Sequence, residues 1–141
     1  MADRKAYKQP QIGPVSTVGA MQRIGTKTGS PAALVAGDLA ANKTVGLFIA
    51  PKGFVLTEIN IVVTDMDTGA TLSFAIGDSV LDNRFVTVNT SAQAGGTVTT
   101  LAATGLRYKF LADTEIVWKT IAAATGAVAG TVTVDFIGYL D

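Results

Sequence analysis

The sequence has no cysteine and no histidine, and only 16% of its 141 residues are charged. Without cysteine, the chain cannot form disulfides or use a thiol nucleophile. Without histidine, it lacks the commonest general acid–base catalyst, and with neither residue it cannot build a Cys/His zinc site. These absences exclude many classes of enzyme and leave the stability of the chain to packing and association.

Long apolar runs are absent as well. No stretch approaches 18 consecutive apolar residues, because charged and polar residues such as Glu58, Lys119 and Asp135 interrupt the richest ones. We therefore predict no membrane-spanning helix. The polar residues 1–8 are not followed by the apolar segment that a secretory signal contains, so no signal peptide is expected.

Small and β-branched residues are abundant. Alanine, valine, threonine and glycine supply about half of the chain, and 48% of all residues are hydrophobic. Valine and threonine favour strands over helices. A chain of this length can bury roughly two-thirds of its unfolded surface in one domain. The composition therefore predicts a single packed β-rich domain and not a disordered chain or a helical bundle.

The net charge of zero hides an uneven distribution along the chain. Residues 1–52 carry seven basic side chains and two acidic ones, Asp3 and Asp38, for a net charge of +5. Residues 53–141 carry four basic and nine acidic side chains, for a net charge of −5. This division indicates a basic arm attached to a mildly acidic body.

Residues 1–42 do not have the pattern of an independent folding unit. Three prolines and five glycines interrupt this stretch, and it has few large apolar residues. Because proline removes a backbone donor and restricts the residue before it, neither a long helix nor a central strand is expected here. We predict an extended N-terminal arm that is either disordered or laid against another surface. Only residues 31–36 are expected to form a helical turn, with Ser30 as its N-cap.

Residues 43–141 show the period of two that is typical of half-buried strands. In the last strand, for example, Val132, Val134 and Phe136 share one side. Strands are predicted at about residues 45–50, 55–63, 72–76, 85–90, 97–101, 107–111, 115–121 and 131–140. Turn signals separate them at roughly 8–12-residue intervals, which favours an all-β fold, an antiparallel β-sandwich or jelly roll.

Two of the connections have specific predicted forms. Residues 51–53 are expected to form a type I turn with Pro51 at its second position and Gly53 at its fourth. Residues 67–69, Asp-Thr-Gly, are expected to close a short hairpin. Among the aromatic residues, Phe74, Trp118 and Phe136 have the parity of core positions, whereas Tyr108 and Tyr139 are expected at the surface or at an interface.

The acidic and hydroxyl residues give little support to catalysis or to metal binding. Aspartates at turns, such as Asp65, Asp67, Asp78 and Asp82, offer the oxygen atoms that calcium prefers, but their spacing does not match an EF-hand loop. Turn aspartates more often accept hydrogen bonds from backbone amides. No serine has the neighbours of an activated nucleophile, and no glycine-rich run has the context of a phosphate-binding loop. We expect no enzyme activity, no metal and no cofactor.

The arm carries the residues most suited to binding a partner, in two alternative ways. Basic side chains can neutralise phosphates and an aromatic ring can stack on a base, which would suit nucleic acid. However, the charges are spread over some 25 residues and the body is acidic, which favours a protein surface as the partner. The predicted partner-binding residues are Arg4, Lys5, Tyr7, Lys8, Arg23 and Lys27.

The chain as a whole resembles a known group of proteins. The resemblance is carried by the Pro/Gly-rich arm, the strand–turn–strand of residues 48–59 (FIAPKGFVLTEI), the Ile-Gly-Asp-Ser of residues 76–79 and the Asp-Asn-Arg-Phe of residues 82–85. It is to the small virion structural proteins of tailed bacteriophages, most of all the head decoration or cement proteins.

This resemblance implies a protein that is made in the host cytoplasm and located on the exterior of the capsid. It implies the major capsid protein as partner, a homotrimer as the favoured oligomer, and the clamping of neighbouring capsid subunits as the role. The arm is then expected to lie on the capsid or on a neighbouring protomer. Two alternatives remain open: a tail, neck or fibre-base component of the virion, and a β-sandwich that binds a carbohydrate or receptor.

Overall fold

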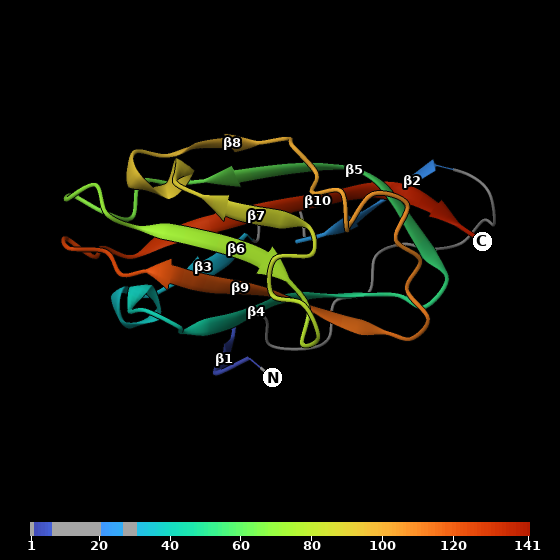
Figure 1. The fold of residues 1–141 in the computed structure, drawn as a ribbon, viewed down its shortest axis with the longest axis horizontal. Coiled ribbons are helices and arrows are strands. Elements are labelled where there is room, and N and C mark those ends of the chain that lie inside the picture. Colours follow the sequence, from blue (N-terminus) through green and yellow to red (C-terminus); the bar gives the residue numbers. More distant parts are fainter. Residues whose placement is uncertain (1, 7–20, 27–30) are drawn as a thin grey trace.

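The computed structural model describes residues 2–6, 21–26 and 31–141, and they form two β-sheets packed face to face (Figure 1). The first sheet has the order β1 (Arg4–Lys5), β4 (Thr44–Ala50), β9 (Thr114–Ala122), β6 (Ser73–Gly77) and β7 (Val86–Asn89). The second has the order β2 (Met21–Gly25), β10 (Gly130–Leu140), β5 (Phe54–Val63) and β8 (Gly96–Val98). Every pairing is antiparallel except that of β1 with β4. The fold is thus an all-β sandwich, as the spacing of strands and turns predicts.

Two short 3₁₀ helices and one further strand complete the described elements. They are β3 (Ala32–Leu34), η1 (Ala36–Leu39) and η2 (Ser91–Gln93). In the described part of the chain, no helix has the length and apolar character that crossing a membrane requires.

The predicted helical turn at residues 31–36 is wrong, because residues 32–34 are extended and pair with β10. Ala32 and Leu34 are buried while Ala33 is exposed. This alternation brings both apolar side chains into the core, which a single helical turn would not do. The described parts of residues 1–42 thus contribute strands at sheet edges. The division of the chain into an arm of residues 1–42 and a body of residues 43–141 stays a prediction.

Seven of the eight strands predicted in the body are present, and the one at residues 107–111 is not. In its place there is a single bridge between Lys109 and Val55. Arg107 has a φ of 58°, in the left-handed region, which interrupts an extended path. The chain nevertheless follows the edge of β5, since the amide of Phe110 donates to the carbonyl of Phe54 at 2.9 Å.

The two predicted turns also differ from expectation. Residues 67–69 do not close a hairpin, because β5 and β6 belong to different sheets and the chain between them crosses from one sheet to the other. The turn after β4 is present, but the amide of Phe54 bonds to the carbonyl of Pro51, so Gly53 occupies its third position. Its φ of +89° is the conformation that a type II turn requires at that position, and glycine adopts it without strain.

Aromatic side chains fill the space between the sheets. Phe136 of β10 lies edge-on to Phe48 of β4, with 5.2 Å between ring centroids, and 5.1 Å from Phe85 just before β7. Within the first sheet, the indole of Trp118 on β9 stacks on the ring of Phe74 on β6, with 4.1 Å between the ring centroids. All five side chains are fully buried, so the predicted burial of Phe74, Trp118 and Phe136 is confirmed.

Replacing Phe136 by alanine should lower the free energy of unfolding by about 3–5 kcal/mol, since it leaves a cavity between the two sheets. Urea unfolding followed by Trp118 fluorescence measures the loss. The matched control is Val88→Ala on the edge strand β7, where the side chain is 58% exposed and the change should stay within about 0.5 kcal/mol. Equal losses for the two variants would contradict this account of the core.

Candidate partner-binding site

The first described residues of the chain form β1, which lies parallel to β4 at the edge of the first sheet. Arg4 is opposite Val45, and Lys5 is opposite Gly46. The amide of Ala6 extends the ladder by donating to the carbonyl of Gly46 at 2.8 Å. The ladder is short, so side-chain contacts on either side of it must contribute to holding β1 in place.

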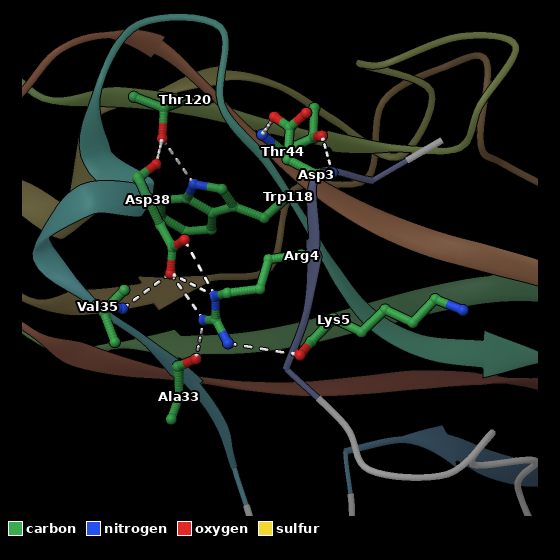
Figure 2. Close-up of polar contacts among 9 residues, drawn as sticks. All are labelled: Asp3, Arg4, Lys5, Ala33, Val35, Asp38, Thr44, Trp118 and Thr120. Atoms are coloured by element: carbon green, nitrogen blue, oxygen red, sulfur yellow. Dashed lines mark hydrogen bonds and ion pairs between the residues drawn. The ribbon is translucent and has the colours of Figure 1, made fainter.

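Asp3 and Thr44 form the first of these contacts, with two reciprocal hydrogen bonds (Figure 2). The amide of Asp3 donates to the Thr44 hydroxyl at 2.8 Å, and the amide of Thr44 donates to the Asp3 carboxylate at 2.9 Å. The bond from the Thr44 amide, with a further contribution from its side chain, lowers the pKa of Asp3 below its ordinary value. The carboxylate therefore stays ionised and remains an acceptor at neutral pH.

Arg4 and Asp38 form the second contact, a forked ion pair (Figure 2). Arg4 Nη2 is 2.7 Å from Asp38 Oδ2, and Arg4 Nε is 3.1 Å from Oδ1. Nη2 also donates to the carbonyl of Ala33 at 2.8 Å. The hydrogen bonds with Asp38 raise the pKa of the Arg4 guanidinium. A two-pronged contact of this kind fixes the orientation of both groups as well as attracting them.

The position of Asp38 depends on the core. Asp38 belongs to η1, and its carboxylate also accepts the amide of Val35 at 2.8 Å. Its carbonyl accepts the hydroxyl of Thr120, which in turn accepts the indole N–H of Trp118 at 3.0 Å. Because Thr120 and Trp118 are fully buried, a continuous chain of hydrogen bonds joins Arg4 to the interior (Figure 2).

The six predicted partner-binding residues have different locations. Arg4 is engaged within its own chain, and its side chain is 38% exposed. Lys5 is exposed on β1. Arg23 is on β2, at the edge of the second sheet, with its side chain 69% exposed and 3.6 Å from Asp135. Tyr7, Lys8 and Lys27 lie outside the described residues. The role of all six in binding a partner stays a prediction.

The sequence did not point to Asp3 and Asp38 as residues of this site. Asp3 and Asp38 are the only acidic residues among the first 52, and both hold β1 in place. Because acidic residues are scarce in this basic stretch, these two could have been predicted to pair with polar or basic side chains near them in the fold. The residue that each aspartate contacts could not be predicted, since Asp3 is 41 residues from Thr44 and Asp38 is 34 residues from Arg4 in the sequence.

Exposed apolar side chains form a second feature that was not predicted. Val80 is 84% exposed, Leu111 77% and Leu106 56%. They belong to the β6–β7 and β8–β9 connections, which lie at the same end of the sandwich (Figure 1). The two connections are in contact, since the guanidinium of Arg84 lies 4.4 Å from the ring of Tyr108.

Three of the four turn aspartates, Asp65, Asp67 and Asp78, accept hydrogen bonds from backbone amides, as expected of residues of this type. Asp82 instead pairs with Lys119 at 2.8 Å. Burial raises the pKa of Asp67, but backbone hydrogen bonds outweigh this effect and hold the pKa well below its ordinary value. The donors, at 2.8–2.9 Å, are the amides of Gly69, Thr71, Leu72 and Gly126. Asp67 thereby ties the β5–β6 crossover to the β9–β10 connection.

Asp78 has a comparable role in the next connection. Its carboxylate accepts the amides of Val80 and Leu81 at 2.9 Å and the Nε of Arg84 at 2.6 Å. Among the residues that the structure describes, no group of three or more acidic, histidine or cysteine residues is arranged to hold a metal ion.

Comparison with known proteins finds likeness in structure but not in sequence families. No family model and no curated protein matches the chain. A chain in the solved structure "Capsid of Ralstonia phage GP4" has a TM-score of 0.77 and 20% identity, over 100% of this chain and 98% of that one. A chain in "Cyanophage Pam1 capsid asymmetric unit" has a TM-score of 0.74 and 22% identity, over 96% of both chains.

A third chain, in "Acidic stable capsid structure of Helicobacter pylori bacteriophage KHP30", has a TM-score of 0.52 and 14% identity over 86% of this chain and 90% of that one. At these identities the comparisons show a shared fold. The coverage also shows that the matched chains are close to this chain in length.

Replacing Arg4 by alanine should release β1 while leaving the sandwich folded. The fork is worth about 1–2 kcal/mol, since Arg4 is more than one-third exposed and water screens its charge. Hydrogen exchange at the amide of Thr44, whose acceptor is Asp3, should therefore become roughly tenfold faster. Lys52→Ala, at an exposed turn lysine, is the control. Unchanged exchange in the Arg4 variant would show that the ion pair does not hold β1.

Replacing Asp67 by asparagine should lower the melting temperature at pH 7. The pKa of Asp67 is lower in the folded than in the unfolded chain, so its stabilising effect is complete above the unfolded value of about 3.9 and is lost as the pH falls below it. The melting temperature of the variant should thus depend less on pH below about 4 than that of the parent chain. Thermal unfolding at several pH values tests this, with exposed Asp141→Asn as the control; parallel curves for Asp67→Asn and the parent would contradict it.

Proposed function

We propose that this chain is a structural protein of a phage virion, which binds the outer surface of the capsid and stabilises it by bridging capsid subunits. The observation that carries the proposal is the match of the whole chain to chains of nearly equal length in two phage capsid structures. The proposed partner is the major capsid protein, the proposed oligomer is a homotrimer, and the proposed role is structural and not enzymatic.

The surface of the molecule has features that suit such a role. Basic residues of the N-terminal segment lie on edge strands, where Arg23 is largely exposed to a partner. An extended segment of this kind can cover a large area of a neighbouring protein while making few contacts with itself. The exposed apolar side chains of Val80, Leu106 and Leu111, on the β6–β7 and β8–β9 connections, are further positions that a partner could cover.

The proposal is tested by adding the purified chain to capsids that lack it and sedimenting the mixture. We expect the chain to sediment with the capsids and to raise the temperature at which they lose integrity. Sedimentation with isolated tails in place of capsids would favour a tail or neck component. Binding to neither particle, together with binding to a glycan array, would favour a receptor-binding module.

The predicted basic residues are tested in the same assay by Arg23→Glu. Reversing an exposed charge at a protein interface should weaken capsid binding about threefold to tenfold and reduce its dependence on salt. The matched control is Lys109→Glu, an equally large charge change on the acidic body at a residue that faces Asp141. If both variants bind like the parent chain, the basic segment does not contact the capsid.

A further inference from the structure

The contacts around β1 form a receptor site for a particular short segment. On one side are residues 2–6, which present a carboxylate, a guanidinium and backbone donors. On the other side is a surface of the sandwich, formed within residues 33–46, whose atoms match these groups one by one: the carbonyl of Ala33, the carboxylate of Asp38, the amide and hydroxyl of Thr44, and the carbonyl of Gly46. Asp38 is also held by contacts outside β1, since its carboxylate accepts the amide of Val35 and its carbonyl accepts the hydroxyl of Thr120.

The site is selective for the segment that fills it here. Asp3 requires the paired donor and acceptor of Thr44, and Arg4 requires a planar acceptor that its fork can grip, which Asp38 provides. Because both partners of each contact belong to this chain, a second copy supplies the same complementary segment without any further adaptation. A second copy is therefore the partner that the chemistry of this site specifies.

The covalent connection permits this exchange. Fourteen residues, 7–20, separate the receptor-bound segment from β2 in the second sheet. Extended, they span up to roughly 46–50 Å, several times the ~10 Å between packed sheets. A connection of this length allows the segment to reach its own body or an adjacent one. The same contacts form in either case, which is the condition for exchange of an element between identical copies.

We propose that the site made by Ala33, Asp38, Thr44 and Gly46 accepts residues 2–6 of a second copy of this chain, so that adjacent copies are joined by exchanged β1 strands. This inference rests on the proposed function in one respect: attachment to one capsid is what brings the copies close together. Covalent linkage of two binding elements typically gives an effective concentration of about the millimolar level, so exchange requires neighbouring copies that the capsid holds at a comparable local concentration.

The exchange can be detected with introduced cysteines, since the full chain has none of its own. The acceptor is the full chain with Thr44→Cys and Arg4→Ala, in which the chain's own segment is weakened. The donor is the full chain with Asp3→Cys. A disulfide between position 3 of the donor and position 44 of the acceptor can form only between two chains, and peptide mass spectrometry distinguishes it from the two symmetric products.

The matched control donor carries Asp3→Cys together with Arg4→Ala. It should form the mixed disulfide at least tenfold more slowly, because it lacks the guanidinium group that the Asp38 carboxylate binds. A single chain with both Asp3→Cys and Thr44→Cys should form an intramolecular disulfide, which establishes that the variants fold and that the two positions meet. If that chain forms its disulfide but the mixed product is absent, or forms equally fast with the control donor, the inference is overturned.

Running the mixture with and without capsids separates this inference from the proposed function. If the mixed disulfide forms in solution but the chains do not sediment with capsids, the result supports strand exchange and argues against the capsid role. Sedimentation on capsids without any mixed disulfide supports the capsid role and overturns strand exchange.

Discussion

The structure depends on the burial of apolar side chains between two sheets. With no cysteine to cross-link it, the domain relies on contacts such as those of Phe136, which touches Phe48 from the opposite sheet and Phe85 beside β7. The N-terminal contacts depend on the same core, since Asp38 is joined through Thr120 to the buried indole of Trp118. The receptor for β1 is therefore anchored to the interior behind it by hydrogen bonds.

This arrangement explains how a stretch with so little capacity to fold alone acquires structure. Residues 1–42 have few large apolar side chains, and their described parts form strands only where an existing sheet edge offers hydrogen-bond partners. Sequence-specific polar contacts then determine where β1 docks. Docking through a few local contacts suits the exchange between copies that we propose.

The alternation of residues predicts the body well because burial of one face imposes a period of two. It identifies Val132, Val134 and Phe136 as core positions regardless of which strand lies next to β10. It does not distinguish a hairpin from a crossover, since the parity of β5 and β6 is the same in both cases, and residues 67–69 were accordingly misassigned. The helical turn at residues 31–36 failed for a related reason: the capping pattern is local, whereas burial of Ala32 and Leu34 against β10 is not. The same limit applies to the site, where Arg4 was identified from charge, but its partner 34 residues away was determined by the fold.

The functional proposal joins a shared fold with a surface suited to attachment. At identities of 20% and 22%, the chains in the two phage capsid structures share the fold of this chain. The measurement that tests the central claim most directly is a cryo-electron microscopy reconstruction of the virion that contains this chain. Our account predicts density for the two-sheet sandwich on the outer surface of the shell, at the junctions between capsid subunits. Density for it only in the tail or neck, or within the continuous shell itself, would contradict that account.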